Sequence, residues 1–179
     1  MIHKIVITGA PASGKTIFID RLKNDIRFAD FIIFSELART LLAENPSYRN
    51  DWSQFHRDIY KQQIERENKY INTSFISDRG TVDAFAFHPE TMNDVGTDIN
   101  KEYIRYNNII HLESTAVLGD KYYNTDEIRN ETIKDAIIIE EKLKNVWSNH
   151  PGYIFINALP SIEKKYKNFL TYVLDIIKI

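Results

Sequence analysis

The feature that most restricts the fold of this chain is a glycine-bounded loop between an apolar run and a helical pattern. Residues 9–16 read Gly-Ala-Pro-Ala-Ser-Gly-Lys-Thr, which fits the spacing GxxxxGK followed by Ser or Thr, and they follow directly on the apolar run at 5–7. Glycines at both ends let the backbone curl so that consecutive N–H groups point at a phosphate, where the next helix begins. The partial positive charge of that helix N-terminus favours the same anion. The pattern therefore predicts a site for nucleotide phosphates.

The residues of this loop have distinct expected roles. Lys15 is expected to reach the β- and γ-phosphates as a point charge, and Thr16 to ligate a Mg²⁺ ion that bridges the same oxygens. ATP and Mg²⁺ are therefore the expected cofactors. The predicted phosphate-binding residues are Gly9, Ala10, Pro11, Ala12, Ser13, Gly14, Lys15 and Thr16.

Length and composition predict one globular domain over residues 1–179. Of the 179 residues, 43% are hydrophobic and 27% are charged, which is enough to bury a substantial core. A formal net charge of -2 gives no large basic field, so we expect no nucleic-acid partner. The absence of cysteine excludes disulfides and thiolate metal sites, and no apolar run is long enough to span a bilayer. These features favour a soluble cytoplasmic protein with no membrane partner.

Apolar runs alternate with helical patterns along the chain. Strands are expected at residues 5–7, 31–34, 74–77, 108–112 and 153–156. Helices are expected at residues 17–23, 35–44 with Ser35 as the N-cap, 51–70, 81–86, 99–106, 131–148 and 161–179. The run at 31–34 is continuous, which is typical of a parallel strand buried on both faces. Together with the phosphate loop, the alternation predicts an α/β fold of the P-loop NTPase type, a five-stranded parallel sheet with helices on both faces.

Charged residues follow the second and third expected strands. Ligands of open α/β sheets collect beyond the carboxyl ends of the strands, so Glu36, Asp78 and Arg79 are expected near the phosphate loop. Glu36 is a candidate base for an attacking hydroxyl, the alternative being a first-turn glutamate favoured by the helix dipole. Asp78 is a candidate Mg²⁺ ligand beside Thr16, or the base in place of Glu36, or a turn-forming residue before Gly80. Arg79 is expected to grip a substrate hydroxyl or phosphate, unless it only pairs with a neighbouring carboxylate.

A polar segment at about residues 114–130 lacks helical or strand periodicity and is long for a plain connection. We expect it to act as a lid. Arg129 near its end is a candidate cation for a transferring phosphoryl group, which a closing lid would also shield from water. The alternative for Arg129 is a solvated arginine at the entry of the next helix. The five histidines show no metal-ligand spacing and are expected to be structural or surface residues.

Taken together, these motifs resemble those of a family of small phosphate-loop ATPase-like domains. The resemblance rests on residues 9–16, on Ser35-Glu36-Leu37-Ala38-Arg39, on Ser77-Asp78-Arg79-Gly80 with Asp83 close behind, and on Arg129 before a late helix. That family includes the ribosylnicotinamide kinase domains of bacterial NAD-biosynthesis regulators. The carboxylate after the second strand and the acidic-arginine pair after the third are also similar to those of deoxynucleoside kinases. This similarity implies that Glu36 is the base and that Arg79 contacts the acceptor hydroxyl.

Two functions from different classes fit the pattern. The first is an ATP- and Mg²⁺-dependent kinase that transfers the γ-phosphoryl group to a hydroxyl of a nucleoside-like metabolite. Its catalytic residues would be Lys15, Glu36, Asp78, Arg79 and Arg129. Gln62 and Gln63 on the long helix are then candidates to hydrogen-bond the acceptor, the alternative being buried amides satisfied within the protein. The second function is a P-loop ATPase or nucleotide-dependent switch that acts through a protein partner. The expected ligands are a nucleoside triphosphate and a small-molecule acceptor, and a homodimer is left open.

Overall fold

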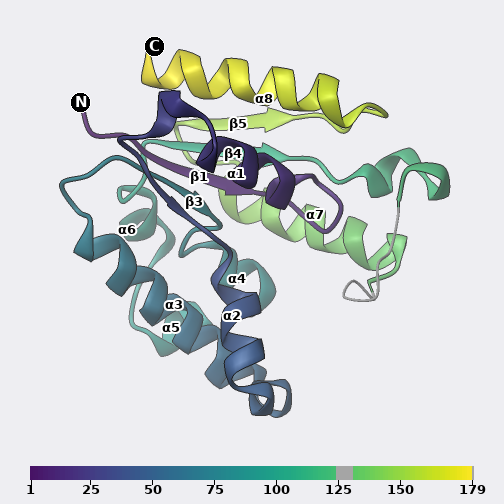
Figure 1. Ribbon diagram of the computed structural model, residues 1–179. Coiled ribbons are helices and arrows are strands. Elements are labelled where there is room, and N and C mark those ends of the chain that lie inside the picture. Colours follow the sequence, from purple (N-terminus) through teal and green to yellow (C-terminus); the bar gives the residue numbers. More distant parts are fainter. Residues whose placement is uncertain (124–130, 179) are drawn as a thin grey trace.

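The strands form a parallel sheet in the order β2-β3-β1-β4-β5 (Figure 1). The computed structural model describes residues 1–123 and 131–178. The strands are β1 (Lys4–Thr8), β2 (Ile32–Phe34), β3 (Phe75–Asp78), β4 (Asn108–Leu112) and β5 (Tyr153–Ile156). β1 therefore lies at the centre of the sheet, between β3 and β4. The five expected strands are confirmed, with ends that differ by no more than one residue.

Helices connect the strands, as the alternating pattern predicts. The α-helices are α1 (Lys15–Lys23), α2 (Leu37–Glu44), α3 (Trp52–Lys69), α4 (Asp83–Phe87), α5 (Thr91–Asp94), α6 (Ile99–Tyr103), α7 (Ile133–Trp147) and α8 (Ile162–Ile177). Short 3₁₀ helices are η1 (Ile26–Phe28), η2 (Pro46–Asn50), η3 (Thr115–Leu118) and η4 (Asp120–Tyr122). The short helix α5 has no counterpart among the expected helices, since four residues are too few to show a helical period.

Two apolar cores lie on opposite faces of the sheet. In β1, Ile5 and Ile7 belong to one core and Val6 to the other, because successive side chains of a strand point to opposite faces. The first face is covered by α1 and α8, which contribute Phe18 and Phe169. The second core is filled from α3, α4, α6 and α7 by Tyr60, Phe85, Tyr103 and Trp147. Figure 1 shows α1 and α8 on one side of the sheet and α3, α4 and α7 on the other.

The strand β2 differs from the expectation that it is buried on both faces. Its three residues are only half-buried, because β2 lies at the edge of the sheet and pairs with β3 alone. The sequence of a strand shows its apolar character but not its place in the sheet.

The start of α2 also differs from the expectation. The helix begins at Leu37 and its N-cap is Glu36, so Ser35 does not cap it. The Glu36 side chain accepts no hydrogen bond from the first turn of α2. The backbone of Glu36 has φ of -58° and ψ of 123°, which turns the chain from the end of β2 into the helix. This turn leaves the Glu36 side chain free to point at the phosphate loop instead of capping its own helix.

The carboxyl ends of β1, β2, β3 and β4 meet at one edge of the sheet, because all these strands run parallel. Asp78 is the last residue of β3 and pairs in register with Ile7, two residues before the phosphate loop. Across the described residues, no helix combines the length and the apolar character that crossing a bilayer requires.

Candidate functional site

The phosphate loop joins β1 to α1 by a backbone that only certain residues can adopt. Gly9 has φ of 145° and Gly14 has φ of 93°, both in the region that favours glycine. A Cβ atom on Gly9 would lie 2.2 Å from the Leu112 carbonyl oxygen, so only glycine fits there. Ala12 is left-handed as well, with φ of 60°. The N-cap of α1 is Gly14, which has no side chain to cap the helix, so N–H groups of the first turn can bind an anion.

Lys15 folds back over this loop. Its Nζ atom donates to the Gly9 carbonyl at 2.6 Å, to the Ser13 hydroxyl at 3.2 Å and to the Ala10 carbonyl at 3.4 Å. Burial lowers the pKa of Lys15 to about 8, and the positive charge of Arg79 acts in the same direction. The lysine therefore occupies the mouth of the loop, within reach of any phosphate that the loop holds.

Thr16 and Asp78 line one small cavity of about 110 Å³ beside the phosphate loop. Asp78 is buried, and its Oδ1 atom has no hydrogen-bond partner among the residues that the structure describes. Burial raises the pKa of Asp78 to about 6. A buried carboxylate oxygen without a partner, next to a threonine hydroxyl, is a suitable donor set for a hard cation such as Mg²⁺. Within the described ranges no cluster of three or more His, Asp or Glu side chains could hold a metal ion, so nucleotide oxygens would have to complete the coordination.

Glu36 and Arg79 form an ion pair beside this cavity. The Arg79 Nε atom lies 3.2 Å from Glu36 Oε1, and the Arg39 Nε atom lies 3.3 Å from Glu36 Oε2. Burial alone would raise the pKa of Glu36, but the charges of Arg79, Lys15 and Arg39 outweigh it and hold that pKa below its usual value. Glu36 therefore stays ionised at neutral pH, with both of its oxygens in contact with arginines.

Arg79 occupies a strained backbone conformation that the sequence does not reveal. Its φ is 71°, in a region that non-glycine residues rarely adopt. The backbone N–H of Arg79 donates to the Ile7 carbonyl at 3.0 Å, and its guanidinium donates to Asp83 Oδ1 at 3.0 Å. These contacts, together with Glu36, fix the guanidinium at the end of the sheet.

Asp83 holds Arg79 and the end of β1 together. Its Oδ1 atom accepts from the Thr8 hydroxyl at 2.6 Å as well as from Arg79. Its Oδ2 atom accepts from the Gly80 N–H at 2.9 Å and from the Trp147 indole at 3.2 Å. Asp83 was part of the family resemblance but was not expected as a site residue. Arg79 and Gly80 lie in the turn just before Asp83, but Thr8 and Trp147 are distant in sequence, so the local pattern alone could not indicate its role in joining these elements.

Two larger cavities meet at Glu36 and Arg79. The first has a volume of about 480 Å³ and is lined by the phosphate loop and by Arg39 and Arg49. The second has a volume of about 540 Å³ and reaches Asp78 and Asp83. Residues that line both cavities are Pro11, Glu36, Ala38, Leu42, Arg79 and Glu131. The phosphate cavity and the second cavity therefore adjoin at the carboxylates of Glu36 and Glu131 and the guanidinium of Arg79.

Aromatic rings cover one wall of the second cavity. Its lining includes Trp52, Phe55, His56, Phe87 and His88. The rings of His56 and His88 stack at 5.4 Å with an angle of 12° between them, and the Arg79 guanidinium lies 5.1 Å from the centre of Phe87. Burial lowers the pKa of His56, which keeps its imidazole neutral. A wall of flat, largely apolar rings is suited to a planar heterocycle.

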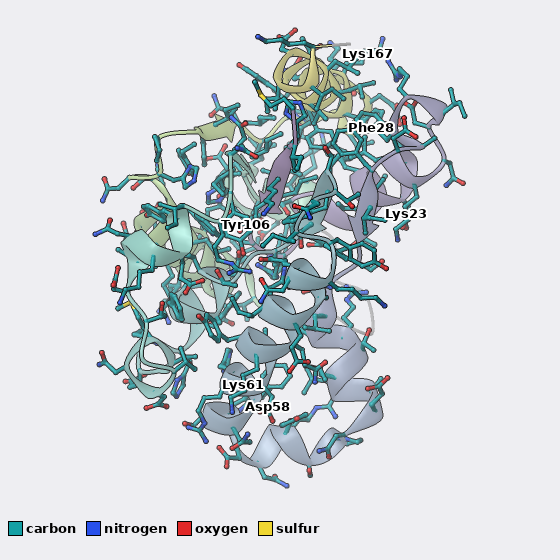
Figure 2. All side chains as sticks on the ribbon, turned by 90° about the vertical axis from the view of Figure 1, so that its left-hand side faces the viewer. Lys23, Phe28, Asp58, Lys61, Tyr106 and Lys167 are labelled. Atoms are coloured by element: carbon teal, nitrogen blue, oxygen red, sulfur yellow. The ribbon has the colours of Figure 1, made fainter. Side chains whose placement is uncertain are left out.

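The amides expected to contact an acceptor have other partners. Gln63 lines the second cavity, but its amide nitrogen donates to Glu67 at 2.6 Å and to Ser77 at 3.1 Å, and its carbonyl accepts from Arg66. Gln62 lines a separate groove on α3 with Asp58 and Lys61. Figure 2 shows Asp58 and Lys61 near one end of the molecule, well away from Tyr106 in its interior. Of the two alternatives given for Gln63, acceptor contact or a buried amide satisfied within the protein, its hydrogen bonds match the second.

The structure also adds residues that were not expected at the site. Arg39 and Arg49 line the phosphate cavity, and Glu131 lines both large cavities. The Glu-Leu-Ala-Arg stretch was one available signal for Arg39, whereas Arg49 and Glu131 lie in sequence with no recognisable motif. Arg129 lies outside the described residues, as do residues 124–130 of the expected lid.

Comparisons with known proteins agree with this geometry. The family of AAA domains matches residues 4–165. Among curated proteins no match is found. A deoxyadenosine kinase from M. mycoides with the products dCMP and dCDP superposes with a TM-score of 0.64 at 14% identity, over 96% of this chain and 99% of that one. The same enzyme with bound dATP gives a TM-score of 0.64 at 13% identity, over 95% and 98% of the two chains.

A further structure of that kinase, with bound dCTP, gives a TM-score of 0.59 at 14% identity, over 96% of this chain and 99% of that one. At these identities the likeness establishes the fold. The expectation of a P-loop NTPase-like fold, similar to that of deoxynucleoside kinases, is confirmed. The specific resemblance to ribosylnicotinamide kinase domains stays a prediction.

Proposed function

The chain belongs to the family of AAA domains, and from this premise we propose that it is a phosphotransferase. In the proposed reaction the γ-phosphoryl group of ATP, with Mg²⁺, passes to a hydroxyl of a nucleoside-like metabolite. The fold shared with a nucleoside kinase supports this proposal, as does the chemistry of the site.

One observation carries the proposal, namely that Glu36 and Arg79 line both the phosphate cavity and the second cavity. A phosphoryl transfer needs a donor phosphate and an acceptor hydroxyl on either side of a base and a positive charge. An ATPase needs only the phosphate cavity and a water molecule. A second chamber of about 540 Å³ is within the size range of small-molecule sites and gives an acceptor somewhere to bind.

The residues would share the work as follows. Lys15 and the N–H groups of the loop hold the phosphates and neutralise their charge. Thr16 and Asp78 hold the Mg²⁺ ion, which supplies charge stabilisation when it is bound. Glu36 accepts the proton of the acceptor hydroxyl, and Arg79 holds that hydroxyl or the transferring group. Arg129 remains a proposed second cation from the lid.

The second cavity favours an acceptor with a planar ring. Its aromatic wall offers stacking surface, while the site end of the cavity carries the carboxylates of Glu36, Asp78 and Asp83 and one guanidinium. An excess of carboxylates over positive charges disfavours an acceptor that already carries a phosphate. Nucleosides, including nicotinamide riboside, combine a ring with a free primary hydroxyl and meet both conditions.

The direct test measures ADP release from Mg²⁺-ATP in the presence of nucleosides, nicotinamide riboside and nucleoside monophosphates. We expect little release with ATP alone and a large increase with one of the nucleosides, with the phosphorylated acceptor identified by mass spectrometry. Glu36→Gln should abolish the increase, whereas Glu44→Gln, at the exposed far end of the same helix, should retain it.

Two results would reject the proposal. Hydrolysis that no acceptor accelerates, and that Glu36→Gln leaves unchanged, would mean that the chain is an ATPase or a nucleotide-dependent switch. Release that depends on a nucleoside but yields no phosphorylated product would mean that the nucleoside acts as a regulator.

A further inference from the structure

The backbone carbonyls of the phosphate loop are engaged one after another. The Gly9 and Ala10 carbonyls accept from Lys15, as described above. The next three carbonyls, from Pro11 to Ser13, accept from groups that lie more than a hundred residues further along the chain. With its carbonyls from Gly9 to Ser13 engaged, this loop offers a phosphate N–H groups and not carbonyl oxygens.

We infer that Glu140, Ser114, Thr115 and Lys165, which we call the brace, are positioning residues that hold the phosphate loop in its nucleotide-binding form. This inference rests on the nucleotide-binding part of the proposed function and does not depend on the acceptor. None of the four residues was indicated by the phosphate-loop motif, because none lies within the motif.

The brace contacts four consecutive residues of the loop. Glu140 Oε2 accepts from the Ala10 N–H at 3.2 Å. The Ser114 hydroxyl donates to the Pro11 carbonyl at 2.5 Å. The backbone N–H and the hydroxyl of Thr115 both lie 3.2 Å from the Ala12 carbonyl oxygen to which they donate. Lys165 Nζ donates to the Ser13 carbonyl at 2.8 Å.

Lys165 is an unusual residue for a helix that covers an apolar face. Only 1% of it is exposed, and it lies on α8 among the residues that pack against the sheet. Its hydrogen-bond partners include the carbonyls of Ser13 and Glu113, the latter at 2.5 Å. Carbonyls carry only partial negative charge, so they do not cancel the charge of the ammonium group. A buried cation therefore lies directly behind the loop, where it attracts the phosphates through the backbone.

Burial lowers the pKa of Lys165 to about 8, and the attraction of Glu140 opposes this. Retaining a lysine with such a high desolvation cost has no benefit for packing, since a methionine would fill the same space. Its position is explained by its effect on the loop.

Glu140 joins the loop to the end of β4. Besides Ala10, its Oε2 atom accepts from the Ser114 N–H at 3.2 Å, and its Oε1 atom lies 2.6 Å from His111 Nε2. His111 is fully buried, and its Nδ1 atom lies 2.9 Å from the Tyr153 hydroxyl. Two backbone N–H groups therefore hold the Oε2 atom of this carboxylate, and the imidazole of His111 lies close to its other oxygen.

The backbone conformation of the loop explains why such support is needed. Ala12 and Gly14 are both left-handed, with φ of 60° and 93°. A left-handed alanine costs free energy that its surroundings must offset. The bonds from Ser114 to the Pro11 carbonyl and from Thr115 to the Ala12 carbonyl hold the peptides before and after Ala12, so they favour its strained form over a relaxed one.

The test compares Lys165→Met and Glu140→Gln with the exposed neighbours Lys164→Met and Glu141→Gln, each in the full chain. Calorimetric titration with Mg²⁺-ADP gives the Kd and the fraction of binding-competent protein separately. We expect the Kd to rise at least about five-fold in both brace variants, within the range for coupling between neighbouring sites. The controls should stay within two-fold of the unchanged protein.

A purely structural role would give a different result. Partial unfolding lowers the binding stoichiometry, while the Kd of the folded fraction stays the same. If the folded fraction of Lys165→Met binds Mg²⁺-ADP with the Kd of Lys164→Met, the inference is overturned. If Lys165→Met does not fold, the Kd of Ser114→Ala for Mg²⁺-ADP tests the inference instead, because this variant removes one hydroxyl and leaves the buried charges in place. An unchanged Kd in that variant would also overturn the inference.

The same comparison separates this inference from the proposed function. A chain that transfers no phosphoryl group, yet binds Mg²⁺-ADP more weakly in the brace variants, would refute the kinase proposal alone. In an active enzyme, the brace variants should raise the KM for ATP and leave the KM for the acceptor unchanged.

Discussion

Replacing Asp83 by asparagine tests how the site is held together. The four described partners of this carboxylate, Thr8, Arg79, Gly80 and Trp147, all donate hydrogen bonds to it. An asparagine has one oxygen and one NH₂ group, so in either orientation the NH₂ group meets two donors. With the NH₂ group toward Thr8, the threonine hydroxyl can turn and accept, but the bond to Arg79 is lost.

The magnitude follows from this arrangement. Asp83 is 2% exposed, and breaking a buried ion pair by removing one partner costs about 3–5 kcal/mol. Reorientation of the threonine hydroxyl recovers part of one hydrogen bond, worth roughly 1 kcal/mol. We therefore expect Asp83→Asn to lower the free energy of unfolding by about 3 kcal/mol. For a chain of this size, that corresponds to a fall in Tm of about 6–12 °C.

Urea unfolding followed by circular dichroism measures this change, with Asp175→Asn as an exposed control on α8. The m-value should be unchanged, since the surface buried in the native state is nearly the same. A free energy of unfolding within about 0.5 kcal/mol of the original chain would refute the reasoning, because surface substitutions have effects of that size. It would mean that the network around Asp83 contributes no net stability.

Three further predictions concern the site. Glu36→Gln should lower kcat by about 10²–10⁴-fold, the usual contribution of a general base, with little change in the KM for ATP. Steady-state kinetics with the identified acceptor measures both constants, and a kcat within about ten-fold of the original would contradict this prediction. The affinity for a nucleoside triphosphate should fall as the pH rises through about 8, because burial lowers the pKa of Lys15 and of Lys165 to about 8 and a deprotonated amine no longer attracts phosphate. Calorimetry from pH 7 to pH 9 checks the sign, and Lys15→Met should weaken the pH dependence, leaving the part that is due to Lys165. Gly9→Ala should destabilise the fold and abolish nucleotide binding, because the added Cβ would lie 2.2 Å from the Leu112 carbonyl oxygen. If this variant binds ATP normally, the loop can shift to make room for the methyl group.

The parts of the fold that depend on neighbouring residues were predictable from sequence. The phosphate loop and the strand at 108–112 are determined by local spacing and by continuous apolar runs, and the structure has this strand at the same bounds. The position of β2 at the edge of the sheet was not predictable, because strand order depends on contacts between distant segments. The same is true of Ser35, which is a good N-cap by composition but is displaced when the chain turns at Glu36.

The candidate site was likewise only partly predictable from the sequence. Strand ends indicated Glu36, Asp78 and Arg79, and the structure places all three around the phosphate loop. Their electrostatics could not be inferred, since the unpartnered oxygen of Asp78 and the left-handed backbone of Arg79 arise from packing. The roles assigned to these residues stay predictions until the variants are measured.

The common wall between the two large cavities has a consequence for ligand design. Glu36 and Arg79 line both the phosphate cavity and the aromatic one, so the two cavities adjoin at these side chains. A compound that links an aromatic nucleoside to a short polyphosphate can therefore occupy both cavities at once. Tethering makes the second contact intramolecular, so the linked compound should bind about 10²–10⁴-fold more tightly than either half. The length of the best polyphosphate linker would then measure the distance that a transferred group has to cross.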